Sequence, residues 1–311
     1  MGSITFITGQ SEDIVKQTLM VELQKHAEKD TVLISRSKSN SEIPTVVISH
    51  MVDAFLSVGD QQVIGFDHLF VELGCLCEYA AKQKIKVYVA GVLSSDDEDL
   101  AQAVTNLLCK CDSITYLPYN EENNYITLIT GPMFAGKTTK MIEILRKEKE
   151  NNTNKITIAI KHSADTRRKP TSRIVTADGI EFRSTLRTQR LMNIYGMILS
   201  LRADIVAIDE GHFFEDLTLF CQGMKIRKIK VYVTALVSTY NRTPFPNMVN
   251  FVPDSIMFLS NLCQICNEAN ASFSMRHHHS PGVNKPDLIH VGGKEIYSAV
   301  CRSCHHNHSR W

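Results

Sequence analysis

A glycine-rich loop in the middle of the chain most constrains the fold, because it matches the pattern that binds nucleotide phosphates. The apolar run before it, residues 125–130, predicts a buried β-strand, and residues 140–146 after it predict a helix. In that setting, backbone N–H groups turn inward and hold phosphate oxygens at the helix N-terminus. Lys137 is expected to reach the β- and γ-phosphates, and the Thr138 hydroxyl to bind Mg²⁺. The loop predicts binding of a nucleoside triphosphate, and it consists of Gly131, Pro132, Met133, Phe134, Ala135, Gly136, Lys137 and Thr138.

The composition bounds the class of protein. The 311 residues leave room for about two domains, and 43% hydrophobic with 22% charged residues is typical of soluble proteins. No apolar run reaches the ~18 residues that span a membrane, and the N-terminus lacks the pattern of a secretory signal. The net charge of +1 gives no reason to expect a nucleic-acid partner. We expect a cytoplasmic protein that binds neither membranes nor nucleic acids, and whose nine cysteines are reduced or bound to metal.

The chain contains an internal repeat, with four matches that occur in the same order. Because chance would not supply four ordered matches, the two parts of the chain are expected to be copies of one domain. The first copy ends near Pro118, and a polar stretch at residues 119–124 links it to the second. The matches are residues 4–9 with 126–131, 84–89 with 228–233, 112–114 with 254–256, and Cys77 with Cys221.

The two copies differ where polar chemistry is expected. After Gly9 the first copy has no second glycine and no Lys-Thr pair, and Glu12 and Asp13 would repel phosphate. Its Asp67-His68 pair also lacks a glutamate like the one that follows Asp209 in the second copy. The first copy is therefore predicted to fold but to have no active site.

An acidic pair follows the apolar run at residues 204–208, at the strand end where open α/β sheets bind ligands. Asp209 is expected to hold Mg²⁺ through water, which leaves Glu210 free to accept the proton of an attacking hydroxyl. The alternative is a solvated acidic turn. Arg167, which follows the strand ending at Lys161, is expected to stabilise charge on a transferring phosphoryl group. Position alone does not separate it from Arg168, Lys169, Arg173 and Arg183.

Two CxxC pairs near the end of the chain supply the four thiolates of a tetrahedral zinc site. Four protein ligands leave no open position for a substrate, so this zinc is expected to be structural. The residues between the pairs, 271–297, are expected to form a long lid. The pairs are Cys263 with Cys266 and Cys301 with Cys304, and His305, His306 or His308 is an alternative ligand. Cys75, Cys77, Cys109 and Cys111 are interpreted as small core residues.

Apolar strand-like runs alternate with helical stretches in the second copy, at residues 155–161, 204–208 and 230–235. This alternation predicts an α/β fold with a mainly parallel sheet covered by helices. The predicted domains are residues 1–118, a linker at 119–124, an α/β domain at 125–260 and a zinc-binding domain at 261–311.

Residues 123–311 resemble the type II, or cellular-type, thymidine kinase family, whose members carry a zinc-anchored lasso loop. The resemblance includes the phosphate loop, Lys161 through Arg167, Ile208 through Gly211, Pro244-Phe245, both CxxC pairs, and Val291-Gly292-Gly293 to Tyr297. Residues 3–118 resemble the family more weakly. The chain thus looks like a tandem fusion, in which a degenerate α/β copy precedes a P-loop kinase domain and a small lasso domain.

The resemblance implies that ATP phosphorylates thymidine to thymidine 5′-monophosphate, a step of nucleoside salvage and DNA precursor synthesis. Glu210 matches the family's proton acceptor. The phosphate loop and Asp165, Thr166, Arg167, Asp209, Gly211 and His212 match positions around ATP and Mg²⁺. The positions around the nucleoside are Met133, Phe213, Leu236, Tyr240, Ser274, Leu288, Ile289, His290, Val291, Gly292 and Tyr297.

The chain departs from the family pattern at several positions. His212 replaces a glutamine, Val237-Ser238 replaces Asp-Gly, and Ser274 replaces a threonine. These departures leave the reaction class unchanged and bear on affinity and on tolerance of analogues. Two alternatives are a kinase for another pyrimidine nucleoside and a nucleotide-dependent nucleic-acid-binding protein in which the CxxC pairs form a zinc ribbon. Because family members are commonly tetramers, the resemblance also implies a homodimer of tandem chains that forms a pseudo-tetramer.

Overall fold

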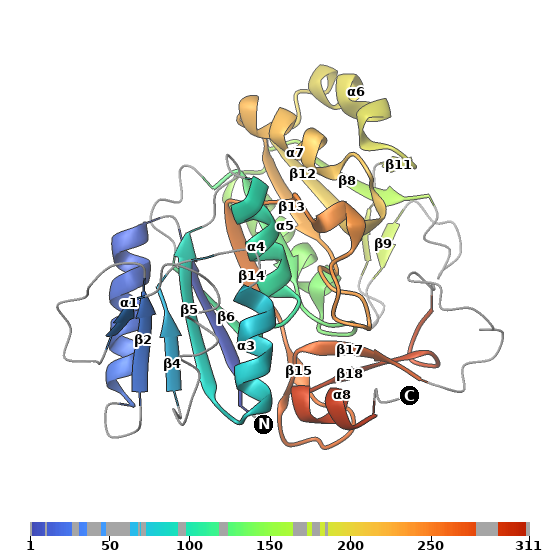
Figure 1. The fold of residues 1–311 in the computed structure, drawn as a ribbon. Helices are drawn as coiled ribbons and strands as arrows, with labels where there is room; N and C mark the ends of the chain where they lie inside the picture. Colours follow the sequence, from blue (N-terminus) through green and yellow to red (C-terminus); the bar gives the residue numbers. More distant parts are fainter. Residues whose placement is uncertain are drawn as a thin grey trace. The chain divides into compact units, whose positions relative to one another are not determined.

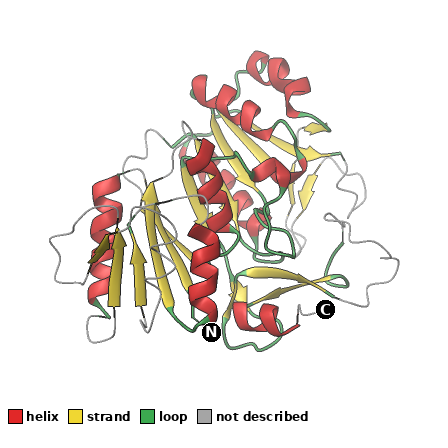
Figure 2. Cartoon of the chain, viewed as in Figure 1, coloured by secondary structure: helices red, strands yellow, loops and turns green. Residues whose placement is uncertain are grey.

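The computed structural model describes residues 2–9, 11–26, 31–35, 45–47, 63–67, 69, 73–92, 98–117, 124–163, 173–175, 181–183, 186–277 and 292–308. The chain divides into two compact units, Met1–Glu121 and Glu122–Trp311. Each unit contains a sheet of strands together with helices (Figures 1 and 2). No helix among the described residues is long and apolar enough to cross a membrane.

The first unit is a parallel sheet covered by helices. Its strands are β1 (Ile4–Gly9), β2 (Thr31–Ser35), β3 (Thr45–Val47), β4 (Val63–Phe66), β5 (Lys86–Val92) and β6 (Ser113–Leu117), and its helices are α1 (Glu12–Gln24), α3 (Leu73–Lys82) and α4 (Glu98–Leu108). The strand order is β3-β2-β4-β5-β1-β6, and every pairing is parallel. α1 packs through Leu19 and Leu23 onto Ile7 and Val63 of the sheet.

The second unit has the same kind of sheet. Its strands are β7 (Ile126–Thr130), β8 (Thr157–His162), β11 (Leu186–Thr188), β12 (Ile205–Asp209), β13 (Lys230–Thr234) and β14 (Ser255–Phe258). They pair in parallel in the order β11-β8-β12-β13-β7-β14, and β9 (Arg173–Val175) and β10 (Glu181–Arg183) form a separate antiparallel pair. The mainly parallel α/β architecture predicted from the sequence is therefore confirmed.

The second unit contains both α-helices and short 3₁₀ helices. Apart from one helix in the C-terminal part, the described α-helices are α5 (Lys137–Asn151), α6 (Tyr195–Ser200) and α7 (Leu217–Ile226), and the short 3₁₀ helices are η2 (Leu191–Ile194), η3 (Gly211–Phe213) and η4 (Pro246–Met248). α5 buries Met141 and Leu145 against Ile129, Ala159 and Ala207, which lie on β7, β8 and β12. This packing fixes the N-terminus of α5 near the carboxyl ends of the strands.

The two sheets share one strand order, because each reads third, second, fourth, fifth, first and sixth when its strands are numbered from its own start. They also share register, with Ile4–Val87 matching Ile126–Val231, Thr5–Ser113 matching Thr127–Ser255, and Val63–Lys86 matching Ile205–Lys230. The carboxylate of Asp112 accepts the N–H of Ile4 at 2.7 Å, and that of Asp254 accepts the N–H of Ile126 at 2.9 Å. The matched letters of the sequence thus occupy matched positions in the two backbones.

The units differ between their fifth and sixth strands. The first unit has α4 there, whereas the second has a hairpin at residues 237–245, followed by η4. We call this segment the β13 hairpin. It is closed by the bridge between Ser238 and Pro244 and by the N–H of Phe245, which donates to the carbonyl of Val237 at 2.9 Å.

The C-terminal part of the second unit is a small lobe, which we call the cysteine lobe. It consists of β15 (Asn261–Leu262), β16 (Asn270–Ala271), β17 (Phe273–Arg276), β18 (Tyr297–Val300) and α8 (Arg302–His308). β17 pairs antiparallel with β18. The prediction of one continuous loop over residues 271–297 was therefore wrong at its start, because a four-residue strand is too short to give a clear alternating pattern. Residues 278–291 of that segment lie outside the described part of the chain.

Three of the four cysteines that the sequence assigned to the core are buried, namely Cys77, Cys109 and Cys111. Cys75 is exposed, so its assignment was wrong. Cys75 and Cys77 both lie on α3, and two positions along a helix turn a side chain by about 200°. A residue that close to a core position therefore points to the opposite side.

Candidate active site

The phosphate loop joins β7 to α5, so it lies at the carboxyl end of the sheet, where α/β folds bind ligands. Gly131 has a φ of 138° and Gly136 a φ of 83°, both in the region that favours glycine. A Cβ atom on Gly131 would lie 2.0 Å from the carbonyl oxygen of Leu259. The shape of the loop therefore requires glycine at both positions.

Lys137 is the first residue of α5, and its side chain is buried within the loop. Its Nζ donates to the carbonyl oxygens of Gly131, at 3.2 Å, and Pro132, at 2.8 Å. These bonds keep the ammonium group inside the curve of the loop, which is where the lysine of a phosphate loop meets the phosphates.

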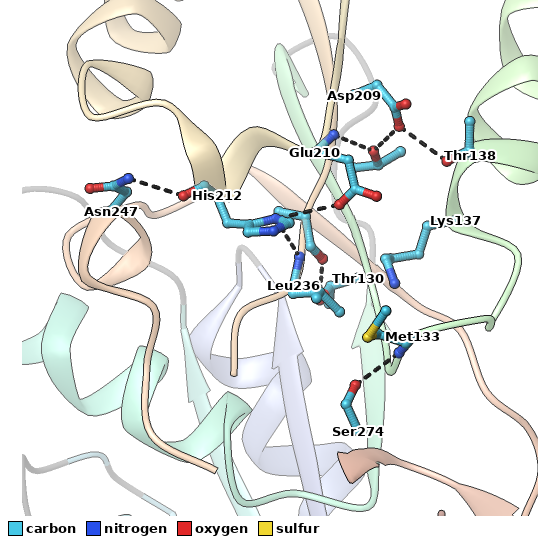
Figure 3. A network of polar contacts seen from close by, with 12 residues as sticks. Thr130, Met133, Lys137, Thr138, Asp209, Glu210, His212, Leu236, Asn247 and Ser274 are labelled. Atoms are coloured by element: carbon cyan, nitrogen blue, oxygen red, sulfur yellow. Dashed lines mark hydrogen bonds and ion pairs between the residues drawn. The ribbon is translucent and has the colours of Figure 1, made fainter. Parts of the chain in front are cut away.

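Asp209 ends β12 and is buried. Its Oδ1 accepts hydrogen bonds from the hydroxyls of Thr138, at 3.1 Å, and Thr234, at 2.7 Å (Figure 3). A loop hydroxyl beside a strand-end carboxylate is the combination with which P-loop enzymes hold Mg²⁺. Both groups offer the oxygen ligands that Mg²⁺ prefers, so the residues fit a divalent ion.

Glu210 follows Asp209 with a φ of 56°, a conformation that is uncommon for a residue other than glycine. Its side chain is 13% exposed, and its Oε2 lies 3.6 Å from Nδ1 of His212. At the end of a strand beside the phosphate loop, this conformation makes Glu210 a candidate for a functional role. Its carboxylate points toward the His212 ring in Figure 3, one residue beyond the carboxylate that accepts from Thr138, which is a suitable place for a proton acceptor.

Thr234 is a site residue that the sequence analysis missed. It ends β13, and its Oγ1 donates to Asp209 and accepts the N–H of Glu210 at 3.1 Å. A signal for it exists in the repeat, because the six residues that match between the copies are followed by Ala90 in one and by Thr234 in the other. The first difference after an unchanged strand marks the residue with a polar role.

His212 was predicted to lie with the nucleotide-binding groups, and its ring points toward Glu210 and Leu236 (Figure 3). It is buried, and its Nδ1 accepts the N–H of Leu236 at 3.2 Å, so the ring proton lies on Nε2. The ring packs against Phe213 and Phe245, with centroid distances of 4.3 and 4.7 Å. His212 thus connects the turn that carries Glu210 to Leu236, the residue just before the β13 hairpin. Gly211 is buried at the start of η3.

The described residues assigned to the nucleoside come from the phosphate loop, η3, the chain after β13 and the cysteine lobe. The N–H of Met133 donates to Oγ of Ser274 at 2.9 Å, which connects the phosphate loop to the cysteine lobe. Tyr240 is half-buried in the β13 hairpin, and Tyr297 is buried at the start of β18. Gly292 is half-buried, whereas Leu288, Ile289, His290 and Val291, like Asp165, Thr166 and Arg167, lie outside the described residues.

The thiol groups of Cys263, Cys266, Cys301 and Cys304 converge on one point, with their sulfur atoms all within 4.8 Å of one another. Burial would raise the pKa of Cys263, but backbone N–H groups, among them that of Cys266, lower it to about 6. Burial raises the pKa of Cys301 and Cys304. Four sulfur atoms at this spacing fit a metal ion.

These features define the chain as a P-loop phosphotransferase: a phosphate loop on a parallel α/β sheet, a carboxylate–hydroxyl pair suited to Mg²⁺, and an adjacent carboxylate suited to accept a proton.

Comparison with known proteins identifies the family within this class. The family model described as thymidine kinase matches residues 124–305, and the chain belongs to the thymidine kinase family. The thymidine kinase of Amsacta moorei entomopoxvirus is 35% identical over 190 residues, which cover 58% of this chain and 98% of the relative. The thymidine kinase of Raccoon poxvirus is 34% identical over 185 residues (59% and 97%), and that of Choristoneura fumiferana entomopoxvirus is 31% identical over 190 (59% and 97%).

Proposed function

We propose that this chain transfers the γ-phosphoryl group of ATP to the 5′-hydroxyl of thymidine. The observation that carries the proposal is the group formed by Asp209, which accepts from Thr138, and Glu210, which is joined to Asp209 through the Thr234 hydroxyl, in a chain that matches the thymidine kinase family over residues 124–305. In the balanced reaction, the 5′-oxygen forms a bond to the γ-phosphorus and the bond to the bridging oxygen breaks. The proton passes to Glu210, and ADP leaves.

Each charged group near the phosphate loop has a part in this reaction. Lys137 and the loop N–H groups bind the phosphates, and Thr138 with Asp209 would hold Mg²⁺, which neutralises charge on the phosphate oxygens when it is bound. Glu210 accepts the proton from the attacking hydroxyl. Arg167, with Asp165 and Thr166, is assigned to the nucleotide side by the family pattern alone.

The nucleoside is assigned to the region between the turn that carries Glu210 and the cysteine lobe. Met133, Phe213, Leu236, Tyr240, Ser274 and Tyr297 carry this assignment, together with residues 288–292. The hydrogen bonds that His212 makes with Leu236, and Ser274 with Met133, support it. The four cysteines would hold a structural Zn²⁺, because four protein ligands leave no position for substrate.

We further propose that residues 1–118 are a copy of the kinase domain without an active site, followed by a linker at 119–124, the P-loop domain at 125–260 and the zinc lobe at 261–311. The shared strand order and register of the two sheets support this division. Two such chains would give an assembly of four sheets with two active sites.

The test is a screen of nucleosides with purified full-length chain and γ-labelled ATP. Thymidine is expected to be the best acceptor, and Lys137→Ala, prepared in the same way, should show no transfer above background. Preference for a different pyrimidine nucleoside would correct the substrate while keeping the reaction. Transfer to no nucleoside, together with ATP hydrolysis stimulated by oligonucleotides, would contradict the proposal.

A further inference from the structure

The β13 hairpin makes a main-chain contact with the cysteine lobe. Nε2 of His305, on α8, lies 2.8 Å from the carbonyl oxygen of Tyr240, near the tip of the hairpin. A carbonyl oxygen only accepts, so Nε2 carries the proton and donates it. The His305 side chain is buried and Tyr240 is half-buried, so loss of this donor would leave the carbonyl of Tyr240 partly shielded from water without its partner.

A second contact joins the same two elements through Phe273 of β17, which is buried. The guanidinium of Arg242, from the hairpin, lies 5.2 Å from the centre of the Phe273 ring, and that of Arg302, from α8, lies 5.1 Å from it. A cation over an aromatic ring is attractive, and more so when the pair is shielded from water. The hairpin is thus attached to the lobe at Tyr240 and at Arg242.

The direction of the His305 ring depends on the cysteine cluster. His305 is next to Cys304, and the backbone N–H of His305 donates to the backbone carbonyl of Cys301 at 2.9 Å. Phe273 belongs to the same buried cluster as the four cysteines. A metal ion on the sulfur atoms would therefore fix the start of α8, and with it the donor that reaches Tyr240.

Two groups contact Tyr240, one at its carbonyl oxygen and one at its ring. Its carbonyl accepts from His305, and the guanidinium of Arg276, on β17, lies 5.4 Å from the centre of its ring. We propose that His305 is a positioning residue for the nucleoside site, which sets the place of Tyr240 through the main chain and so couples metal binding by the cysteines to nucleoside affinity. This rests on the proposed function, because it takes Tyr240 to contact the nucleoside.

The first test compares His305→Ala, His305→Gln and Asn307→Ala in the full-length chain, with zinc content measured for each. His305→Ala is expected to keep its zinc and to raise the KM for thymidine about tenfold, as loss of one hydrogen bond would, with kcat and the KM for ATP within about twofold. The amide N–H of glutamine can replace the donor, so His305→Gln should restore most of the affinity. Asn307 is exposed on the same helix, and its substitution should change nothing.

A second measurement does not depend on nucleoside binding. Hydrogen exchange of the amides in residues 237–245 should be slower with zinc than without it in the wild type, and equally fast in both states in His305→Ala. Should no nucleoside be phosphorylated, this difference still tests the contact by itself. Arg242→Met, which removes the cation over Phe273, should raise the same KM and serves if His305→Ala does not fold. The proposal is overturned if His305→Ala loses zinc, or if folded variants show unchanged KM and unchanged exchange.

Discussion

The hydroxyl of Thr234 joins the two acidic residues of the site. It donates to the Asp209 carboxylate at 2.7 Å and accepts the N–H of Glu210 at 3.1 Å. Because the Thr234 hydroxyl makes both hydrogen bonds at once, it ties the backbone turn at Glu210 to the carboxylate of Asp209. The side chain of Glu210 takes no part in these bonds, so it can change without disturbing the turn.

Glu210→Gln is therefore expected to fold and to bind ATP and thymidine with near-normal affinity, while kcat falls by roughly 10²–10⁴-fold, the usual worth of a general base. Steady-state kinetics at saturating substrates, with calorimetry for binding, check this. Glu215→Gln provides the control, because Glu215 is exposed and only five positions away. Near-normal turnover of Glu210→Gln would remove the carboxylate from the mechanism.

The sequence predicts the site residues that belong to local motifs and misses those that depend on neighbouring strands. Lys137, Thr138 and the Asp209-Glu210 pair are recognised from their place after a strand. The contacts of Thr234 depend on the pairing of β13 with β12, which no local pattern gives. The orientation of His212 likewise depends on where the chain after β13 passes.

At the scale of elements, the last turn of α5 is tied to β13 through one carboxylate. Glu148 accepts from the hydroxyl of Tyr232 at 2.9 Å, from Nζ of Lys155 at 2.6 Å and from Nζ of Lys230 at 3.5 Å. The side chain of Glu148 is 15% exposed, so water screens these contacts only in part. They hold in place the helix whose first residue is Lys137.

Glu148→Gln should lower the free energy of unfolding by about 1–2 kcal/mol at neutral pH. Burial would raise the pKa of Glu148, but the hydrogen bonds from Lys155 and Tyr232 hold it below its usual value. Such a group stabilises the fold above its unfolded pKa, about 4.3, and loses that contribution as the pH falls through the folded pKa.

Urea unfolding at neutral pH and below about pH 4 measures this difference, which should shrink in acid. Glu143→Gln, on the same helix, removes an exposed pair with Lys140 and should have little effect at either pH. A difference that is the same at both pH values would show that the charge of Glu148 contributes nothing.

The cysteine lobe should require its metal. We expect about one zinc per chain, and we expect its removal by a chelator to weaken thymidine binding about tenfold or more, because Ser274 of the lobe holds the N–H of Met133. Cys304→Ser should lose zinc, whereas Cys75→Ser, which removes an exposed thiol outside the cluster, should keep it. Elemental analysis and calorimetry decide, and an active preparation without zinc would contradict the prediction.

At the scale of the whole molecule, the sequence predicts the parallel α/β class but not the strand order. The repeated apolar runs predict which segments are strands. The helical stretches between these runs indicate that consecutive strands are joined through helices and not by simple hairpins. The order, however, depends on pairings between strands far apart in the chain, such as β1 with β6, whose register joins Thr5 to Ser113. Only the structure shows that the strands of both sheets are paired in the same order.

The first unit has the strand order of the second, but two of its described positions differ from the matching positions of the candidate site. Ala90 stands where Thr234 links the acidic pair, so no hydroxyl is available at that point. α1 begins with Glu12 and Asp13, whereas α5 begins with Lys137 and Thr138. A triphosphate approaching the start of α1 would meet negative charge rather than an ammonium group.

The full-length chain is therefore expected to bind one thymidine, because its first sheet keeps the packing residues and lacks those that bind phosphate. Removal of residues 1–118 should lower the molar mass of the assembly, or its stability, more than it lowers kcat at the remaining site. Calorimetry gives the number of thymidine molecules per chain, and light scattering gives the molar mass before and after removal, with the mass of two chains expected for the intact protein. Lys16→Ala is a suitable control, because it changes only an exposed ion pair with Glu12 on α1. Two thymidine molecules per chain would show that the first unit has a working site, and a monomeric full-length chain would show that it does not build an assembly.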